Sequence, residues 1–216
     1  MPFGRHLFKG TDSIRHFDRR YPSTTDKNGY ETTVISAVAI STTNFSGRCW
    51  RPHLHPTQPP KPVIEASFGG FAPLVTEMLA GPGFGWHIET AVHVLRMVLG
   101  GVFDRFPKLQ IVIGHMGEGL PFFIQRGDVM SVELTALKRP VSAYLRDNLH
   151  YTFAGFNFPP TFLDLLLEIG ASRIMFSADY PYGSMAKARA FLEQIPVSAA
   201  DRARIAHGNA EKLFRL

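Results

Sequence analysis

Short apolar segments alternate with longer amphipathic ones over residues 50–216, and this alternation indicates the fold class. Three segments predict buried strands, at residues 109–115, 149–155 and 173–181. Each is a short apolar run followed by glycine or polar residues, which is typical of a strand covered on both faces. Residues 51–60 predict a short strand and then a proline-rich loop, because proline cannot donate to the hydrogen bonds of a sheet.

Between these strands the apolar residues recur at helical spacing. The longest predicted helix spans residues 86–103. Its apolar positions are Ile88, Ala91, Val92, Leu95, Val98, Leu99 and Val102. Further helices are predicted over residues 120–130, 159–170, 184–195, 198–207 and 209–215. Strands that alternate with helices of this length indicate right-handed βαβ units and a parallel sheet, so the expected class is α/β.

Residues 1–50 have a different texture. Twelve of them are Ser or Thr, and only residues 33–40 (TVISAVAI) predict a strand. We therefore expect two regions. Residues 1–49 form an atypical front segment, poorly ordered or unrelated to the rest of the chain, and residues 50–216 form one α/β domain.

Charge and composition narrow the classes of function. The net charge is +5, but residues 1–50 hold seven basic and four acidic residues, and the remainder holds 16 and 14. Without a basic run, this balance predicts no nucleic-acid partner. The single cysteine, Cys49, favours a reducing compartment, and no apolar run approaches the ~18 residues of a membrane span. We expect a cytoplasmic protein that does not bind a membrane.

Three predicted strands end in side chains that bind metals or transfer protons: His55, His115 and Asp179. Ligands of α/β sheets meet the loops after the carboxyl ends of the strands, so these side chains are expected to converge. Imidazole nitrogen and carboxylate oxygen are ligands of zinc and manganese. His53 lies two residues before His55, on the same face of a strand, and is a possible additional ligand. Any one of these residues alone is better explained as a polar strand cap or helix N-cap, and their joint occurrence at three strand ends is what favours a site.

Residues 114–118 (GHMGE) are the most informative segment. Two glycines flank His115, which allows the backbone to approach a ligand closely. Glu118 is expected in the first turn of the following helix, where the helix dipole favours it. It is also close enough to bond His115 and to set its tautomer. The alternative for Glu118 is an ordinary first-turn carboxylate.

The other polar candidates carry weaker signals. Arg126, eight residues after Glu118, is by itself an exposed charge. His87 and His93 lie six residues apart in the longest predicted helix and share no face, which favours packing or interface roles for both. His150 and His207 have no partner nearby in the sequence, and we assign no role to them.

These segments resemble the second amidohydrolase-related family. The resemblance rests on HIETAVHVLRMVLGGVFDRFPKLQIVIGHMGEGLPFFIQR, with HLHPTQPP before it and IMFSADYPYG and HGNAEKLF after it. It covers roughly residues 50–216. The family contains aminocarboxymuconate semialdehyde decarboxylase and the γ-resorcylate, 2,3-dihydroxybenzoate and 5-carboxyvanillate decarboxylases.

The resemblance implies a (β/α)8 barrel with one divalent metal, zinc or manganese. By similarity, His55 and Asp179 are metal ligands, and Asp179 also donates a proton to the substrate carbon. His115 matches the catalytic histidine and Glu118 its carboxylate partner. Arg126 matches an arginine that reaches a substrate carboxylate across a dimer interface, so a homodimer or larger oligomer is expected.

One departure from the family pattern concerns the front of the chain. The family begins with a strand that ends in an E-x-H or H-x-H pair, and residues 1–50 contain neither. A barrel normally takes about 250 residues, so we expect an incomplete one with roughly strands five to eight. The expected function is a metal-dependent carboxy-lyase acting on a hydroxybenzoate-like acid. The alternatives are a metal-dependent hydrolase of a lactone or amide, which His115 serves equally well, and an inactive fragment.

Overall fold

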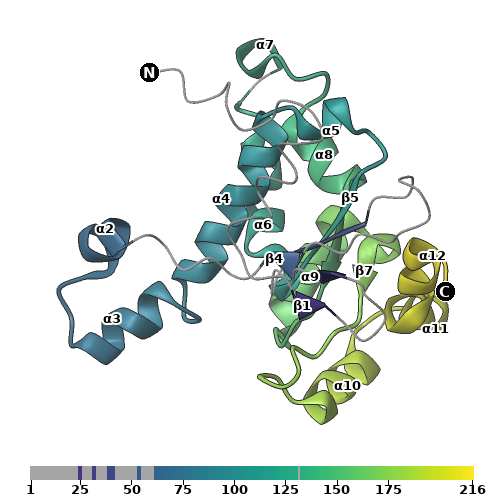
Figure 1. Ribbon diagram of the computed structural model, residues 1–216. Coiled ribbons are helices and arrows are strands. Elements are labelled where there is room, and N and C mark those ends of the chain that lie inside the picture. The colour runs from purple at the N-terminus through teal and green to yellow at the C-terminus, as the bar shows by residue number, and fades with distance from the viewer. Residues whose placement is uncertain (1–23, 26–30, 33–37, 42–52, 55–60, 131) are drawn as a thin grey trace.

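A computed structural model describes residues 61–130 and 132–216, together with four short strands nearer the amino terminus (Figure 1). Those strands are β1 (Thr24–Thr25), β2 (Glu31–Thr32), β3 (Val38–Ser41) and β4 (His53–Leu54). β1 and β2 form a separate antiparallel pair. The predicted front segment, residues 1–49, therefore falls mostly outside the described residues.

A five-stranded sheet with the order β4-β3-β5-β6-β7 forms the centre of the molecule. Its last three strands are β5 (Gln110–Ile113), β6 (Leu149–Thr152) and β7 (Ile174–Met175). β5, β6 and β7 are parallel, as the sequence predicts. β3 is antiparallel to both β4 and β5, which departs from a wholly parallel sheet. The alternation of strands with helices begins only after β4, so it carries no prediction for the direction of β3.

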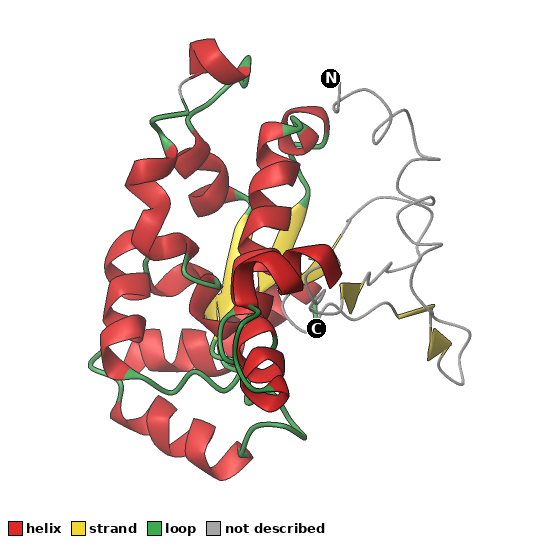
Figure 2. Cartoon of the chain, turned by 90° about the vertical axis from the view of Figure 1, so that its left-hand side faces the viewer, coloured by secondary structure: helices red, strands yellow, loops and turns green. Residues whose placement is uncertain are grey.

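Helices surround the parallel strands (Figure 2). They are α2 (Lys61–Val63), η1 (Ile64–Phe68), α3 (Pro73–Ala80), α4 (Gly85–Leu99), α5 (Val102–Arg105), η2 (His115–Gly117), α6 (Leu120–Gly127), α7 (Val132–Thr135), α8 (Val141–Asp147), α9 (Pro159–Ile169), η3 (Ala171–Arg173), α10 (Met185–Gln194), α11 (Ala199–Ala203), η4 (Arg204–Gly208) and α12 (Asn209–Phe214). The five shorter predicted helices are all present within a few residues of their expected bounds. The helices α3 and α8 were not predicted.

The single helix predicted over residues 86–103 is wrong in two respects. It is divided into α4 and α5 at Gly100 and Gly101, and Gly101 has a left-handed φ of 69° that ends the first helix. The buried side of α4 is also displaced from the predicted one: Thr90, Val94 and Val98 are buried, whereas Ile88, Val92 and Leu99 are exposed. Apolar residues occupy more than one face of this helix, so spacing alone does not select the buried one.

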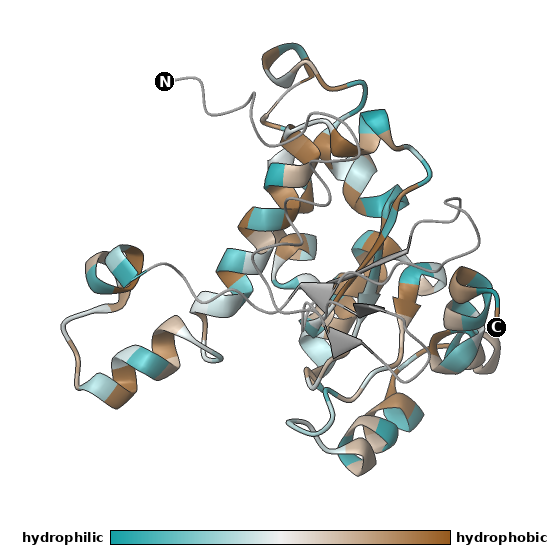
Figure 3. Ribbon diagram, in the orientation of Figure 1, coloured by the Kyte–Doolittle hydropathy of each residue, from teal (hydrophilic) through white to brown (hydrophobic). Residues whose placement is uncertain are grey.

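The core lies where the parallel strands meet the helices. Ile111 and Ile113 of β5 and Leu149 and Tyr151 of β6 have no exposed surface. Figure 3 shows the central strands mostly in hydrophobic colours, whereas the surrounding helices alternate between hydrophobic and hydrophilic residues. Burial of each large side chain contributes about 1.5–3 kcal/mol, so these strands are the stable platform from which the loops emerge.

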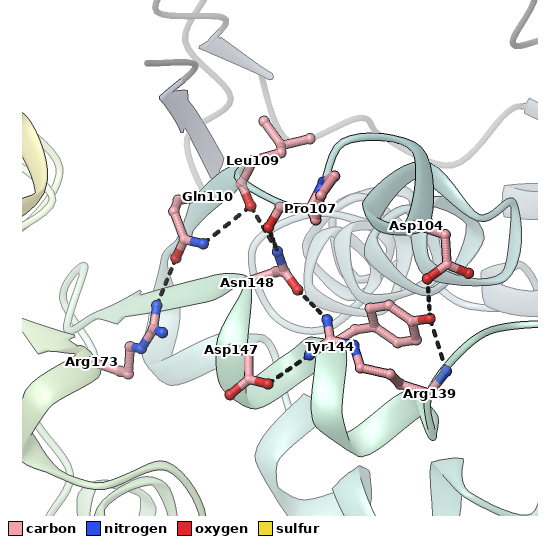
Figure 4. A network of polar contacts seen from close by, with 9 residues as sticks. All are labelled: Asp104, Pro107, Leu109, Gln110, Arg139, Tyr144, Asp147, Asn148 and Arg173. Atoms are coloured by element: carbon pink, nitrogen blue, oxygen red, sulfur yellow. Dashed lines mark hydrogen bonds and ion pairs between the residues drawn. The ribbon is translucent and has the colours of Figure 1, made fainter. Parts of the chain in front are cut away.

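Polar bonds hold the starting ends of β5 and β6 together (Figure 4). The side-chain amide of Asn148 donates to the carbonyls of Pro107 and Leu109 at 3.2 and 2.9 Å. Nη2 of Arg139 donates to Oδ1 of Asn148 at 2.9 Å, and Arg173 donates to Gln110 at 2.6 Å. These bonds tie down the amino ends of the strands, at the opposite edge of the sheet from the loops that carry His115 and Asp179.

The segment from α2 to α3 projects away from the sheet (Figure 1). Its exposed apolar side chains include Phe71, Leu74 and Met78. Across the described residues no single helix is long and apolar enough to cross a membrane. One pair, Lys61–Phe68 with Pro73–Leu99, passes on length and composition together but is bent by 109°.

Candidate active site

The loop after β5 has an unusual backbone. All five residues from His115 to Gly119 have positive φ angles: 46°, 55°, 89°, 56° and 80°. Three of them, His115, Met116 and Glu118, carry side chains that disfavour this conformation. Such strain persists only where the surrounding structure enforces it, and it is concentrated at functional sites. The turn directs His115 and Glu118 toward each other.

A buried carboxylate joins two imidazole rings at this turn. Oε1 of Glu118 lies 2.6 Å from Nδ1 of His115, the bond that their spacing predicts. Oε2 of Glu118 bonds Nδ1 of His87. The Glu118 side chain is only 1% exposed. Its two hydrogen bonds replace the water that an ionised carboxylate requires.

His87 is the site residue that sequence reasoning missed, since we assigned it to packing or an interface. It lies near the start of α4, and its Nε2 is 3.1 Å from the carbonyl of Pro82. Burial acts to lower the pKa of His87, but the bond and charge of Glu118 and the Pro82 carbonyl raise it above its ordinary value. A separation of 31 residues between His87 and Glu118 leaves no local spacing by which sequence could find the pair.

Glu118 does not lie in the first turn of a helix, where the sequence pattern predicts it. It precedes α6, whose amino-terminal cap is Gly119, and the first turn of α6 contains no acidic residue. The left-handed φ of Glu118 ends the preceding turn instead. The carboxylate is therefore stabilised by the two imidazoles rather than by the dipole of α6.

Gly117 serves packing rather than a ligand. A Cβ at this position would lie 2.7 Å from Cδ1 of Tyr151 and 2.9 Å from Cδ of Pro121. The glycine thus lets the turn lie directly against the ring of Tyr151 in β6. This contact, together with the positive φ, explains the second glycine of the GHMGE segment.

Asp179 lies in the loop that follows β7. The loop is tight: the N–H of Gly183 donates to the Asp179 carbonyl at 2.6 Å, and a Cβ on Gly183 would lie 1.9 Å from the Ala178 oxygen. Oγ of Ser177 accepts from the N–H of Ala154 at 2.7 Å, which links the loops after β6 and β7. These constraints place Asp179 at the same end of the sheet as His115.

The charge environment shows that Asp179 belongs to the cluster. Burial raises the pKa of its carboxyl, nearby His115 lowers it, and nearby Glu118 raises it. The Asp179 carboxyl makes no hydrogen bond or ion pair with any residue in the described ranges. The structure thus places His115, Glu118 and Asp179 at one end of the sheet and adds His87, whereas His55, the third residue of the strand-end argument, lies outside the described residues.

Two groups of side chains have the chemistry to hold a metal ion. The ligand atoms of His87, His115 and Glu118 lie within 4.8 Å of one another. Both oxygens of Glu118 are already bonded to the rings, so this trio forms a hydrogen-bonded chain as it stands. The carboxyl of Asp179, which has no partner among the described residues, is the better fit to a cation. Its expected co-ligand, His55, lies outside the described residues, as does the side chain of His53.

Arg126 is not part of this cluster. It lies on the exposed side of α6, beside the exposed rings of Phe122 and Phe123. Its guanidinium has no hydrogen bond or ion pair within the part of the chain that the structure describes. The predicted role of Arg126, contact with a substrate across a dimer interface, stays a prediction.

An α/β sheet with an imidazole–carboxylate cluster at the carboxyl ends of its parallel strands β5 to β7 defines the class: an α/β protein with a metal- and proton-competent site at that edge. The sequence pattern of the family described as Amidohydrolase matches residues 52–216. The chain therefore belongs to the amidohydrolase family. The predicted boundary after residue 49 stays a prediction.

Similar proteins include several decarboxylases. The chain is 38% identical over 169 residues to a gamma-resorcylate decarboxylase of Polaromonas sp., which covers 76% of this chain and 50% of that protein. It is 33% identical over 171 residues to the decarboxylase orsB of Emericella nidulans, which covers 76% of this chain and 52% of that protein. The chain spans about half the length of these curated relatives.

The similar solved structures also include decarboxylases. A dihydroxybenzoic acid decarboxylase of Polaromonas sp., with bound manganese and the inhibitor 2-nitroresorcinol, is 38% identical with a TM-score of 0.68 and covers 76% of this chain and 49% of that chain. A 5-carboxyvanillate decarboxylase of Sphingomonas paucimobilis is 34% identical with a TM-score of 0.67 and covers 76% and 48%. The predicted incomplete barrel is confirmed, and the expected divalent metal agrees with the manganese bound in the Polaromonas structure; zinc gains no support.

Proposed function

We propose that this chain carries the site of a metal-dependent, non-oxidative decarboxylase acting on a hydroxybenzoate-like carboxylic acid. The observation that carries the proposal is the convergence of Asp179 with the His115–Glu118 pair after β7 and β5. The substrate class is supported by the relatives, which are named for gamma-resorcylate and dihydroxybenzoic acid. The hydrolase alternative gains no support from these relatives.

The chemistry replaces a ring carboxylate by a proton. In the proposed mechanism, protonated Asp179 donates to the ring carbon that bears the carboxylate. The bond between that carbon and the carboxylate then breaks, its electron pair restores the aromatic ring, and carbon dioxide leaves. Asp179 regains its proton from solvent. His115 accepts the proton of the substrate's ortho-hydroxyl at Nε2, because Glu118 holds Nδ1, and returns it to the same oxygen once carbon dioxide has left.

A divalent cation would be held by the carboxyl of Asp179, which has no partner in the described part of the chain, with His55 as the second ligand that the family resemblance implies. When bound, such an ion acts as a Lewis acid and template for the substrate carboxylate and hydroxyl. Arg126, whose planar guanidinium binds carboxylates through two parallel bonds, serves the substrate of a partner subunit. The protein in this proposal is a homodimer or larger oligomer in the cytoplasm.

A substrate panel tests the reaction class. The purified chain is incubated with Mn²⁺ and either 2,6-dihydroxybenzoate and related ortho-hydroxybenzoates, or simple lactones and amides. We expect carbon dioxide and the matching phenol in equal amounts from a hydroxybenzoate, with no acid released from a lactone or amide. Acid release without carbon dioxide contradicts the proposal and assigns the site to hydrolysis.

A further inference from the structure

His87 occupies a position in the site that neither the family resemblance nor the spacing of residues assigns. Its ring lies 5.0 Å from that of His115, and Phe156 packs 5.0 and 5.2 Å from the two rings. Both ring nitrogens of His87 are engaged, one by Glu118 and the other by the Pro82 carbonyl. The side chain of His87 is 15% exposed. Because both of its nitrogens are bonded, the ring of His87 is fixed in place and can restrict the orientation of the Glu118 carboxylate.

Glu118 has two oxygens and two imidazole partners, so each partner constrains the other. Because His87 occupies Oε2, the carboxylate plane is fixed and Oε1 faces Nδ1 of His115. A carboxylate accepts a hydrogen bond only from a protonated nitrogen, so Nδ1 of His115 carries the proton. Nε2 of His115 has no hydrogen bond within the described residues, so it is the nitrogen at which the neutral ring would accept a substrate proton as a general base.

We propose that His87 is a positioning residue that clamps Glu118 and, through it, fixes the tautomer of His115 with its proton on Nδ1. The inference rests on the proposed function only for its catalytic consequence. Pro82 and the first turn of α4, which lie outside the loop after β5, fix the ring of His87. The strained loop therefore does not have to orient the Glu118 carboxylate by itself.

Two substitutions separate the hydrogen bond from the packing of the ring. His87→Asn places an amide N–H near the position of Nδ1 and removes the aromatic ring. His87→Phe keeps a ring against Phe156 and removes the donor. The readout is the pair of ring ¹⁵N shifts of His115 in the full chain at pH 8, which report the tautomer without any turnover.

We expect the wild-type chain and His87→Asn to show His115 protonated on Nδ1. In His87→Phe we expect at least half of the His115 population to shift to the Nε2-protonated form, because Glu118 can turn away. If His87→Phe fails to fold with its unpaired carboxylate oxygen, His87→Ala, which admits water to that oxygen, is expected to show the same shift.

Three results overturn the proposal. The first is an unchanged His115 tautomer in the folded variant that lacks the donor. The second is retention of the Nδ1-protonated form of His115 in His87→Phe together with its loss in His87→Asn, which assigns His87 to packing. The third is a joint shift of the His87 and His115 ring signals on addition of Zn²⁺, which makes the trio a metal site.

In the active chain, kcat is expected to fall about tenfold in His87→Phe at unchanged KM and to recover in His87→Asn. Because the tautomer is read without substrate, failure of the decarboxylase proposal leaves this test intact.

Discussion

A buried carboxylate is stable only when partners replace its lost water, and Glu118 meets this condition with two histidines. One of the two bonds, that between His115 and Glu118, can be predicted from the sequence. His115 and Glu118 are three residues apart in a strand-to-helix loop, so their bond follows from local geometry. His87 lies in the helix α4, and only the tertiary packing of this helix brings it to Oε2.

His150 supports a prediction about pH. Burial, with added effects from the charges of Arg173 and Lys212, lowers the pKa of His150 to about 4. In an unfolded chain the pKa is about 6.5. Between pH 6.5 and 4, His150 therefore binds a proton in the unfolded state but not in the folded state. The free energy of unfolding accordingly falls as pH falls through this window.

We expect the wild-type chain to lose up to about 3 kcal/mol more than His150→Gln between pH 7 and pH 4. Gln keeps an oxygen that can accept from Arg173, as Nε2 of His150 does. Urea denaturation of both proteins at the two pH values measures the difference. Equal losses in the two proteins would show that His150 does not resist protonation.

Among the elements, β5, β6 and the shorter helices could be predicted in place, whereas the strand predicted over residues 173–181 is only the two-residue β7. β5 and β6 are short apolar runs bounded by turn residues, and both are buried as expected. The long helix over residues 86–103 could not be predicted in detail, because its apolar positions fit more than one buried side and its two glycines permit a break. The left-handed turn from His115 to Gly119 could not be foreseen either, since three of its residues do not favour that conformation.

The turn after β5 gives a matched pair of glycine substitutions. Gly117 and Gly119 both have positive φ, at 89° and 80°, but a Cβ collides with Tyr151 only at Gly117. We expect Gly117→Ala to lower the free energy of unfolding by about 3 kcal/mol, from strain and overpacking together. Gly119→Ala, with open space around it, is expected to cost about 1 kcal/mol. Urea denaturation that finds equal costs would contradict the packing role of Gly117.

For the whole molecule, the fold class was accessible from the alternation of strands and helices, and the incomplete barrel from the motifs. Among the described residues the sheet ends at β4 and β7, and an open edge of a sheet favours association with another chain. The exposed rings of Phe122 (74%) and Phe123 (58%) add an apolar surface next to Arg126 on α6. The exposure of the two rings is not apparent before the packing of α6 is known.

These surfaces predict self-association through α6. We expect a dimer or larger species in sedimentation at micromolar concentration, and at least tenfold weaker association in Phe122→Glu, which places a charge on the apolar surface. Met185→Glu is the matched control, because Met185 is a half-exposed apolar residue on the separate helix α10. A monomeric wild-type chain, or equal weakening by both variants, would remove α6 as the interface.

Asp179 and the His115–Glu118 pair are proposed to form a decarboxylase site, and the rate of carbon dioxide release tests this assignment. The rate is measured from 2,6-dihydroxybenzoate with Mn²⁺, for the wild-type chain, Asp179→Asn and the control Asp164→Asn. Burial raises the pKa of the Asp164 carboxyl too, but this residue lies on α9 rather than in the loop after β7. We predict release by the wild-type chain and Asp164→Asn, and at least a hundredfold loss in Asp179→Asn. Equal rates in Asp179→Asn and the wild-type chain, or no release by any folded form, would contradict the assignment.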